Sequence, residues 1–485
     1  MSSNLTPFFA APPGNPSAER LLLISYHFPP GDAVGALRWQ KLSLEAARRG
    51  WALDVITVHP SSLQRTDGDR LAELPPSTRV YGVPATRLLI DDLERAVWSV
   101  VRRLKTVRRR GSAPDRGTLS KSSDEGRPHS LARADVLTRG WSRRAAIRTY
   151  YAWLYHRRNL RWAEGAHALG ARLARDARPR AVISCGPPHE AHVAASTIAA
   201  RFAVPHVVDM RDPWSLVERL PEIIAAPITY RAAERHEARV MRAAQLVVCN
   251  TEPAAEAMRA RYPHLGDRCI AVMNGYDADP LPPAAPDRRF LIAYAGSIYL
   301  DRDPGALFRA AARVIHDQGL TPADFGIELM GHEEIAAGPG VLDLAKREGI
   351  SEYVRRHAPG SRTAALEFLS RAAMLVSLPQ DSDMAIPSKV FEYMRYDAWL
   401  LALADAGSAT ARLLTRGGAD IVAPHDVVGI ARVLEHRLEE FRRSGTPRTP
   451  ALVPSSSRAE QARIFFAALD RVLGRPASRI GQSAT

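Results

Sequence analysis

The chain has 485 residues, of which 46% are hydrophobic and 24% are charged, and its formal net charge is +14. The composition is that of a folded chain, the length predicts two or three domains, and no apolar run is long enough to span a bilayer. The excess of positive charge favours polyanionic partners, which are nucleic acid, an acidic membrane surface or phosphorylated substrates.

The segment 1–19 is rich in Pro, Ala and Ser and contains no basic region followed by a hydrophobic stretch. We therefore expect a disordered N-terminal lead-in rather than a signal peptide.

A strand–helix–strand unit with glycines in its first loop is predicted next. The strands are expected over 20–26 and 52–58, and the helix over 37–49. Gly31 and Gly35 lie in the first loop, where glycine lets a backbone come close to a ligand. The Gly-x-Gly-x-x-Gly spacing of dinucleotide-binding loops is absent, so a plain strand-to-helix loop is the alternative interpretation.

Residues 95–165 interrupt this α/β rhythm with a basic insertion. A cationic cluster is followed by a Ser/Gly/Pro/Asp-rich loop over 111–130 and then by arginines interleaved with tryptophans and tyrosines. The cationic cluster consists of Arg102, Arg103, Lys105, Arg108, Arg109 and Arg110. This pattern suits an anionic membrane surface or nucleic acid, and a solvated basic insertion is the alternative.

Two further strands, over 181–185 and 205–210, are predicted to deliver polar side chains to one sheet edge. His189 and His192 follow the first of these strands, and Arg211 and Asp212 follow the second. Because the carboxyl ends of parallel strands meet at one edge, these side chains are candidates for a site. Structural histidines and an Arg–Asp ion pair are the alternatives.

A Pro/Ala-rich linker over 279–288 separates this part from a second α/β region. The first strand there, 290–295, is followed by Gly296, Ser297 and Arg302. Ser297 can donate one hydrogen bond to a phosphate and Arg302 a bidentate pair.

A later strand, over 373–378, leads to a helix that is expected to begin near Pro387 and Ser388. Lys389 and Glu392 lie one turn apart on one face of this helix. A carboxylate there can accept hydrogen bonds from both hydroxyls of a ribose, and a helix N-terminus attracts phosphate. An ordinary surface ion pair between the two side chains is the alternative.

Several of these segments resemble those of one family. Pro-Ser-Lys-Val-Phe-Glu-Tyr-Met (387–394) resembles the nucleotide-sugar-binding helix of retaining, family 4-like glycosyltransferases of the GT-B fold, which include many bacterial cell-surface polysaccharide enzymes. Three segments ahead of it are also similar: Pro-Pro-Gly-Asp-Ala-Val-Gly-Ala-Leu-Arg (29–38), Cys-Gly-Pro-Pro-His-Glu-Ala-His (185–192) and Val-Asp-Met-Arg-Asp-Pro-Trp (208–214). The order of these motifs, over most of residues 20–475, carries the resemblance.

The resemblance implies an α/β GT-B fold, in which two Rossmann-like parallel-sheet domains face each other across a cleft. The N-terminal domain would span 20–280 and the nucleotide-sugar-binding domain 281–455, while residues 456–485 would supply a C-terminal helix that packs back on the first domain, and a tail. The implied reaction transfers a sugar from a nucleotide diphosphate sugar to a saccharide or lipid-linked acceptor, with retention and with no cofactor or required metal.

The resemblance also implies roles for individual residues. Glu392 would bind the donor ribose, and Arg302 and Lys389 the diphosphate, with Ser388, Ser297 and Gly296 beside them. The positions expected nearest the reacting sugar are His189, Arg211 and Asp212, and the acceptor-side loops would include Gly31, Gly35 and His192.

The chain departs from the family pattern at three positions. Many relatives have a glutamate at the position of Met384, a histidine at that of Arg211 and an arginine at that of Ser297. A sugar-nucleotide-binding scaffold without catalysis and a GT-B-fold nucleotide-sugar epimerase are therefore alternatives. A nucleic-acid-binding protein is a third, supported by charge alone.

The expected location is the cytoplasm, with peripheral attachment to the inner face of the membrane. The three cysteines, Cys185, Cys249 and Cys269, match no metal-binding spacing and are expected to be reduced thiols. An anionic membrane surface would hold a lipid-linked acceptor, and no specific nucleic acid partner is expected.

Overall fold

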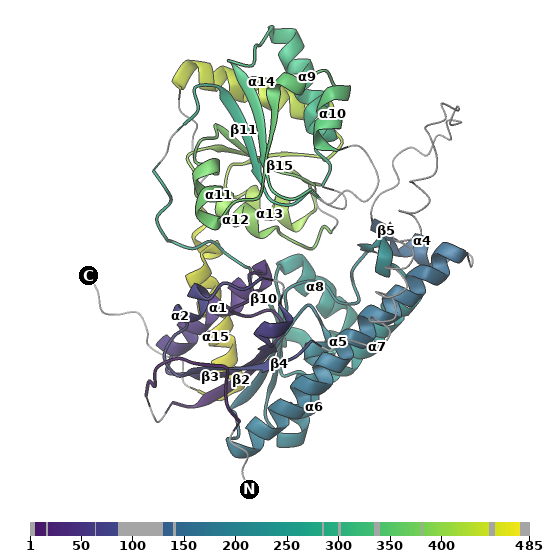
Figure 1. Ribbon diagram of the computed structural model, residues 1–485, viewed down its shortest axis with the longest axis vertical. Coiled ribbons are helices and arrows are strands. Elements are labelled where there is room, and N and C mark those ends of the chain that lie inside the picture. Colours follow the sequence, from purple (N-terminus) through teal and green to yellow (C-terminus); the bar gives the residue numbers. More distant parts are fainter. Residues whose placement is uncertain are drawn as a thin grey trace, which may run out of the picture.

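The structure, a computed structural model, describes residues 5–15, 18–63, 65–85, 130–138, 142–283, 286–298, 302–333, 340–379, 382–445 and 452–475. Two parallel sheets with helices on both faces form two domains, one above the other in Figure 1. This is the α/β architecture that the sequence predicts.

The first sheet has eight strands in the order β1-β4-β3-β2-β6-β7-β9-β10 among the described residues. All neighbouring pairs are parallel except β1 with β4. Every residue of β3 and β6 is buried, as expected for strands covered by helices on both faces. The strands are β1 (Phe9–Ala10), β2 (Arg20–Ser25), β3 (Ala52–Val58), β4 (Thr78–Val83), β6 (Ala181–Gly186), β7 (His206–Met210), β9 (Leu246–Cys249) and β10 (Cys269–Ala271).

The helices of the first domain connect consecutive parallel strands, as right-handed crossovers require. They are α1 (Val34–Arg48), α2 (Asp69–Ala72), α5 (Arg143–Asp176), α6 (Glu190–Phe202), α7 (Pro227–Ala243) and α8 (Glu252–Arg261). Single 3-10 turns lie at η1 (Pro60–Ser62), η2 (Glu222–Ile224) and η3 (Pro263–Arg268).

The second sheet has six parallel strands in the order β13-β12-β11-β14-β15-β16 among the described residues. They are β11 (Phe290–Ala295), β12 (Phe325–Met330), β13 (Val354–His357), β14 (Met374–Ser377), β15 (Trp399–Leu403) and β16 (Asp420–Val422). The helices are α9 (Gly305–Gln318), α10 (Val341–Arg347), α11 (Arg362–Leu369), α12 (Ser388–Tyr393), α13 (Ala409–Leu414) and α14 (Val427–Ser444), with 3-10 turns at η4 (Ser351–Tyr353) and η5 (Pro454–Ser456).

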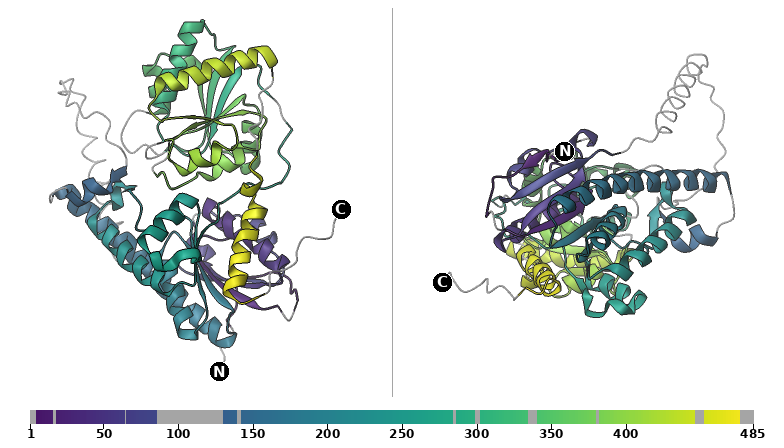
Figure 2. Two further views of the ribbon diagram at one scale, coloured as in Figure 1. Left: turned by 180° about the vertical axis from the view of Figure 1, so that it is seen from behind. Right: turned by 90° about the horizontal axis from the view of Figure 1, so that it is seen from below.

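The last described helix, α15 (Arg458–Val472), returns to the first domain. Phe465 packs edge-on against Trp39 of α1, with ring centres 5.4 Å apart, and Asp470 forms an ion pair with Arg49. The yellow helix beside the purple segments in Figure 2 shows this placement. Near its start, Ser457 pairs with Tyr276 in an isolated parallel bridge.

The basic insertion is described only in its second half. The cationic cluster 102–110 and most of the predicted loop lie outside the described residues. The described part begins with a two-stranded sheet of β5 (Ser130–Ala132) with β8 (Arg219–Pro221). It continues with α4 (Arg133–Thr138) and the 34-residue helix α5, whose first half extends beyond the first sheet (Figures 1 and 2). Within the described parts of the chain, no helix is long and apolar enough to cross a membrane.

The prediction of a disordered segment over 1–19 is wrong for residues 9 and 10. Phe9 and Ala10 form β1, which pairs antiparallel with Val80 and Arg79 at the open edge of β4. A strand of two residues is too short to show the alternation of apolar and polar residues by which strands are predicted.

Candidate active site

Loops from the carboxyl ends of both sheets meet between the domains. The hydroxyl of Thr251, just after β9, donates a hydrogen bond of 2.6 Å to the carbonyl of Met384, in the loop between β14 and α12. Arg412 of α13 also lies 3.3 Å from Glu256 of α8. In α/β folds ligands bind at this end of the strands, so the candidate site lies here.

On the first-domain side, Arg211 lies against Gly35, which belongs to the first turn of α1 and not to the preceding loop where the sequence predicts it. A Cβ atom built on Gly35 would be 1.7 Å from the Nη1 atom of Arg211, so this residue must lack a side chain for the guanidinium to stay in place. The same guanidinium donates hydrogen bonds to the carbonyls of Gly186 and Pro187, at 3.1 and 3.2 Å. The structure thus brings Gly35 and Arg211 together, as the sequence predicts for one edge.

The strand end that presents Arg211 is fixed by a buried ion pair. Asp209, fully buried, accepts hydrogen bonds from Arg38 at 2.8 Å and from the indole nitrogen of Trp39 at 2.8 Å. Arg38 also donates a hydrogen bond of 3.3 Å to the carbonyl of Met273, two residues after β10. Sequence reasoning did not single out this pair, because its members are 171 positions apart in the sequence.

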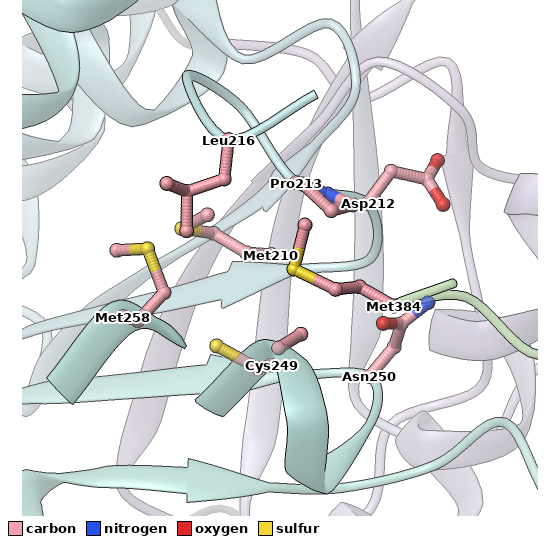
Figure 3. A pocket seen from close by; sticks show the side chains of 9 residues that line it. Met210, Asp212, Pro213, Leu216, Cys249, Asn250, Met258 and Met384 are labelled. Carbon is pink, nitrogen blue, oxygen red and sulfur yellow. The ribbon is translucent and has the colours of Figure 1, made fainter. Parts of the chain in front are cut away.

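His189 lies at this edge, stacked on Trp214 with ring centres 5.1 Å apart. Burial and the neighbouring Arg211 lower the pKa of His189 to about 3. Asp212, in contrast, is exposed, and its carboxylate points away from the sulfur atoms in Figure 3.

The prediction that His192 lines the acceptor side is wrong. Its side chain is fully buried, and its Nδ1 atom lies 2.8 Å from the hydroxyl of Ser184 on β6. On α6 the phase of the helix turns this side chain toward the sheet, which a spacing of three residues from His189 does not reveal. Gly31 lies in the first loop, where its carbonyl accepts a hydrogen bond of 2.7 Å from Arg70.

On the second-domain side, Lys389 projects from α12 over the turn after β11. Its ammonium nitrogen would be 2.2 Å from a Cβ atom on Gly296, which has a φ of +148°. This nitrogen also lies 2.6 Å from the hydroxyl of Tyr294. Burial, with a further contribution from Arg302, lowers the pKa of Lys389 well below its usual value. A cation held in this way can bind an anion at the Gly296 turn.

Glu392, one turn after Lys389, is paired with Arg362 of α11 at 2.8 Å. The side chain of Glu392 is 26% exposed and that of Arg362 is 58% exposed, so both are accessible to a ligand. Burial lowers the pKa of Arg70 of the first domain, and the charge of Arg362 makes a smaller contribution in the same direction. Sequence reasoning did not single out Arg362, which lies 30 positions before its partner.

The other residues that the sequence predicts on the donor side are Ser388, Ser297 and Arg302. Ser388 is exposed at the first position of α12, and Ser297 accepts a hydrogen bond from Tyr294 through its carbonyl. Arg302 lies at the start of the next described segment and acts electrostatically on Lys389. Among the described residues, no cluster of three or more His, Cys, Asp or Glu side chains could hold a metal ion.

Met384, at which the motif resemblance implies a glutamate, lies in a hollow of the first domain. The thioethers of Met210, Met258 and Met384 and the thiol of Cys249 line this hollow, which Figure 3 shows from close by. The rest of its lining consists of Asp212, Pro213, Leu216, Asn250 and Ala254. The side chain therefore joins the two domains through an apolar contact instead of presenting a carboxylate.

Similarity to known proteins is found at the level of the fold. No protein-family model matches the chain, and no curated protein matches it significantly. Among solved structures, HepE from Anabaena in complex with UDP-glucose is similar with a TM-score of 0.55 and 12% identity, over 93% of this chain and 100% of that chain. Sucrose-phosphate synthase from Thermosynechococcus elongatus is similar with a TM-score of 0.54 and 12% identity, over 93% of this chain and 97% of that chain. The lipopolysaccharide outer core galactosyltransferase WaaB is similar with a TM-score of 0.51 and 11% identity, over 93% of this chain and 99% of that chain. The chain has the GT-B fold.

Proposed function

We propose that the protein is a glycosyltransferase that moves a sugar from a nucleotide diphosphate sugar to a saccharide or lipid-linked acceptor, in cell-surface polysaccharide synthesis. The observation that carries the proposal is the arrangement of Lys389, Glu392 and Gly296 at the carboxyl edge of the second sheet. A cation above a glycine turn suits a diphosphate, and a carboxylate one helical turn away suits a ribose diol. A solved neighbour of the same fold holds UDP-glucose, which supports a donor of this class.

In this proposal the donor side supplies binding and charge. Glu392 would accept hydrogen bonds from the ribose hydroxyls, in exchange for or in addition to its pairing with Arg362. Lys389, Arg302 and the backbone amides near Gly296 would stabilise the negative charge that develops on the leaving diphosphate. Retention of configuration and a reaction without a required metal rest on the motif resemblance.

The first domain would hold the acceptor. Gly31 and Gly35 would let the acceptor and the diphosphate approach the first loop, and Arg211, Asp212 and His189 would lie on the acceptor side. The described part of the insertion carries the exposed apolar side chains Leu137, Ile147, Trp153 and Tyr155. Their presence near arginines of α5 supports an anionic membrane surface as a partner.

A thermal-shift screen of nucleotides and nucleotide sugars tests the donor class, since a ligand that binds only the folded state raises its stability. Release of the nucleoside diphosphate in the presence of an acceptor then tests transfer. Donor binding without transfer to any acceptor would favour the scaffold, and interconversion of the sugar without acceptor would favour the epimerase.

A further inference from the structure

Arg211 is surrounded by histidines that the fold keeps uncharged. Burial and then the charge of Arg211 lower the pKa of His27 to about 4. The pKa values of His189 and His192 are also lowered, with burial as the largest cause and the charge of Arg211 among the others. At neutral pH the positive charge of this sheet edge therefore resides on the guanidinium.

The donors and acceptors can be assigned along the chain of hydrogen bonds that begins at His189. His189, His192, Ser184 and His206 form a chain in which Ser184 Oγ lies 2.8 Å from both His192 Nδ1 and His206 Nε2. His206 Nδ1 is buried and has no hydrogen-bond partner among the described residues. Because a buried N–H without an acceptor is rare, this nitrogen is the unprotonated one, and His206 donates from Nε2 to Ser184.

That assignment fixes the other proton positions. The hydroxyl of Ser184 donates to His192 Nδ1 at 2.8 Å in preference to the carbonyl of Val207 at 3.5 Å, so His192 carries its proton on Nε2, which faces His189 Nδ1 at 3.4 Å. His189 then carries its proton on Nε2, and its interaction with the backbone of Pro213 agrees, since a proline backbone can only accept. His189 is thus a fixed neutral donor that does not neutralise or compete with Arg211.

The guanidinium itself is bonded only to carbonyl oxygens. Its side chain donates to Gly186 and Pro187, and within the described residues no carboxylate forms an ion pair with it. Asp209, two positions earlier, is occupied by Arg38 and Trp39. Arg211 is partly exposed, on the first-domain side of the candidate site.

We infer that Arg211 binds an anionic group of the substrate, a phosphate or a carboxylate, on the first-domain side. The inference rests on the proposed function for its place in a reaction, but the binding itself does not. A guanidinium stays charged when it is partly buried, and its planar fork matches two oxygens of a carboxylate or phosphate. The neutral histidines and Gly35 leave this charge without a counter-ion from the described residues, and a substrate oxyanion would supply one.

The group has two chemical sources. One is the phosphate of a phosphorylated or lipid-diphosphate acceptor, and the other is the carboxylate of an acidic sugar. The probes are therefore methyl phosphate and glucuronate, with glucose as the uncharged comparison.

The experiment measures binding of each probe by NMR of protein labelled with ¹⁵N-histidine, in the wild type, in Arg211→Gln and in Arg211→Lys. Arg178→Gln is the matched control, because Arg178 also donates to a backbone carbonyl but lies away from the site. We expect Arg211→Gln to raise the pKa of His27 and His189, and to weaken the binding of one charged probe about tenfold or more. Arg178→Gln should bind as the wild type does.

The outcomes separate the sources. Binding of methyl phosphate alone assigns a phosphorylated acceptor, and binding of glucuronate alone an acidic sugar. Equal affinity of wild type and Arg211→Gln for both charged probes, or equal binding of glucose, overturns the inference. Nucleotide binding is measured separately, so a protein that binds the anion but no nucleotide sugar refutes the proposed function and leaves this inference standing.

Discussion

The ammonium nitrogen of Lys389 lies 2.6 Å from the hydroxyl oxygen of Tyr294 and 3.9 Å from the centre of its ring. The ring and the turn at Gly296 replace much of the water that would otherwise solvate the charge. Burial therefore lowers the pKa of Lys389 well below its usual value. A diphosphate placed beside this nitrogen would restore the charged form.

The first prediction is that binding of a nucleoside diphosphate takes up a proton. The pKa of Lys389 is low in the free protein and would rise next to phosphate, so between the two values the lysine gains a proton on binding. Affinity should accordingly fall as the pH rises through this interval. Calorimetry in buffers of different ionisation enthalpy measures the uptake, which Lys389→Met should abolish.

Lys389→Met provides a second check through stability. Because the folded-state pKa of Lys389 is below that of the unfolded chain, protonation disfavours folding, and the stability of the wild type rises with pH across this interval. The variant should therefore melt at a higher temperature near neutral pH, and the difference should shrink toward pH ~10. A variant that is less stable at neutral pH would contradict this account of the lysine.

The second prediction concerns Glu392. Glu392→Ala should weaken nucleotide binding by roughly 1.5–3 kcal/mol, the worth of a hydrogen bond to a charged group, while the fold stays intact. Arg362→Gln is the matched control, since it removes the partner at 2.8 Å but leaves the carboxylate in place. Unchanged nucleotide affinity in Glu392→Ala would remove the ribose assignment.

The third prediction uses Gly31, just before α1, and Gly35, in its first turn. Gly35→Ala would place a methyl group 1.7 Å from Arg211 Nη1, so the guanidinium must move. We expect a loss of transfer activity with little loss of stability, because a flexible side chain can yield. Gly31→Ala tests the other glycine separately, since its new methyl group would meet the Phe28 carbonyl at 3.2 Å and Leu63 beyond it and would leave Arg211 in place. Activity at the wild-type level in Gly35→Ala would show that the position of Arg211 is unimportant.

The fourth prediction concerns the domain contact at Met384. Met384→Glu would introduce a carboxylate among thioethers and the thiol of Cys249. We expect a lower melting temperature or an opening of the domains, visible by small-angle scattering, and no gain in activity. Met384→Leu should behave as the wild type. Higher activity in Met384→Glu would instead mean that the carboxylate reaches the donor sugar.

The fifth prediction concerns α5. Ile147 and Trp153 are 49% and 41% exposed on its first half, in a chain of net charge +14. The protein should bind anionic vesicles, bind neutral ones weakly, and be released by salt, since the Debye length is about 8 Å at physiological ionic strength. Ile147→Ser with Trp153→Ser should weaken the binding without changing nucleotide affinity. Equal vesicle binding of the double variant would exclude these side chains from the contact, and binding to RNA that survives physiological salt would favour the nucleic-acid alternative.

The sequence predicted the elements of this fold well, because their pattern is local. Continuous apolar runs such as 21–24 and 400–403 become fully buried strands, and the loops that follow them carry the candidate residues. Lys389 and Glu392 were predicted on one short helix, and both lie on α12.

The sequence could not predict the contacts that depend on the order of strands in the sheets. Gly35 meets Arg211 because β2, β6 and β7 are neighbours, and Arg362 reaches Glu392 because α11 and α12 precede and follow the same strand, β14. The burial of His192 depends on the rotation of α6 about its axis. None of these follows from spacing along the chain.

The bridge between Tyr276 and Ser457 has a consequence for how the chain is assembled. There the backbone amide of Tyr276 donates to Ser456 at 3.1 Å, and that of Arg458 donates to Tyr276 at 2.8 Å, so the segments that leave and re-enter the first domain run side by side. The second domain is therefore an insertion whose two ends leave the first domain at one place. Joining residue 276 to residue 457 through a short linker should yield the first domain with α15 as a separate folding unit, and the same two points would accept a donor-binding domain from another protein.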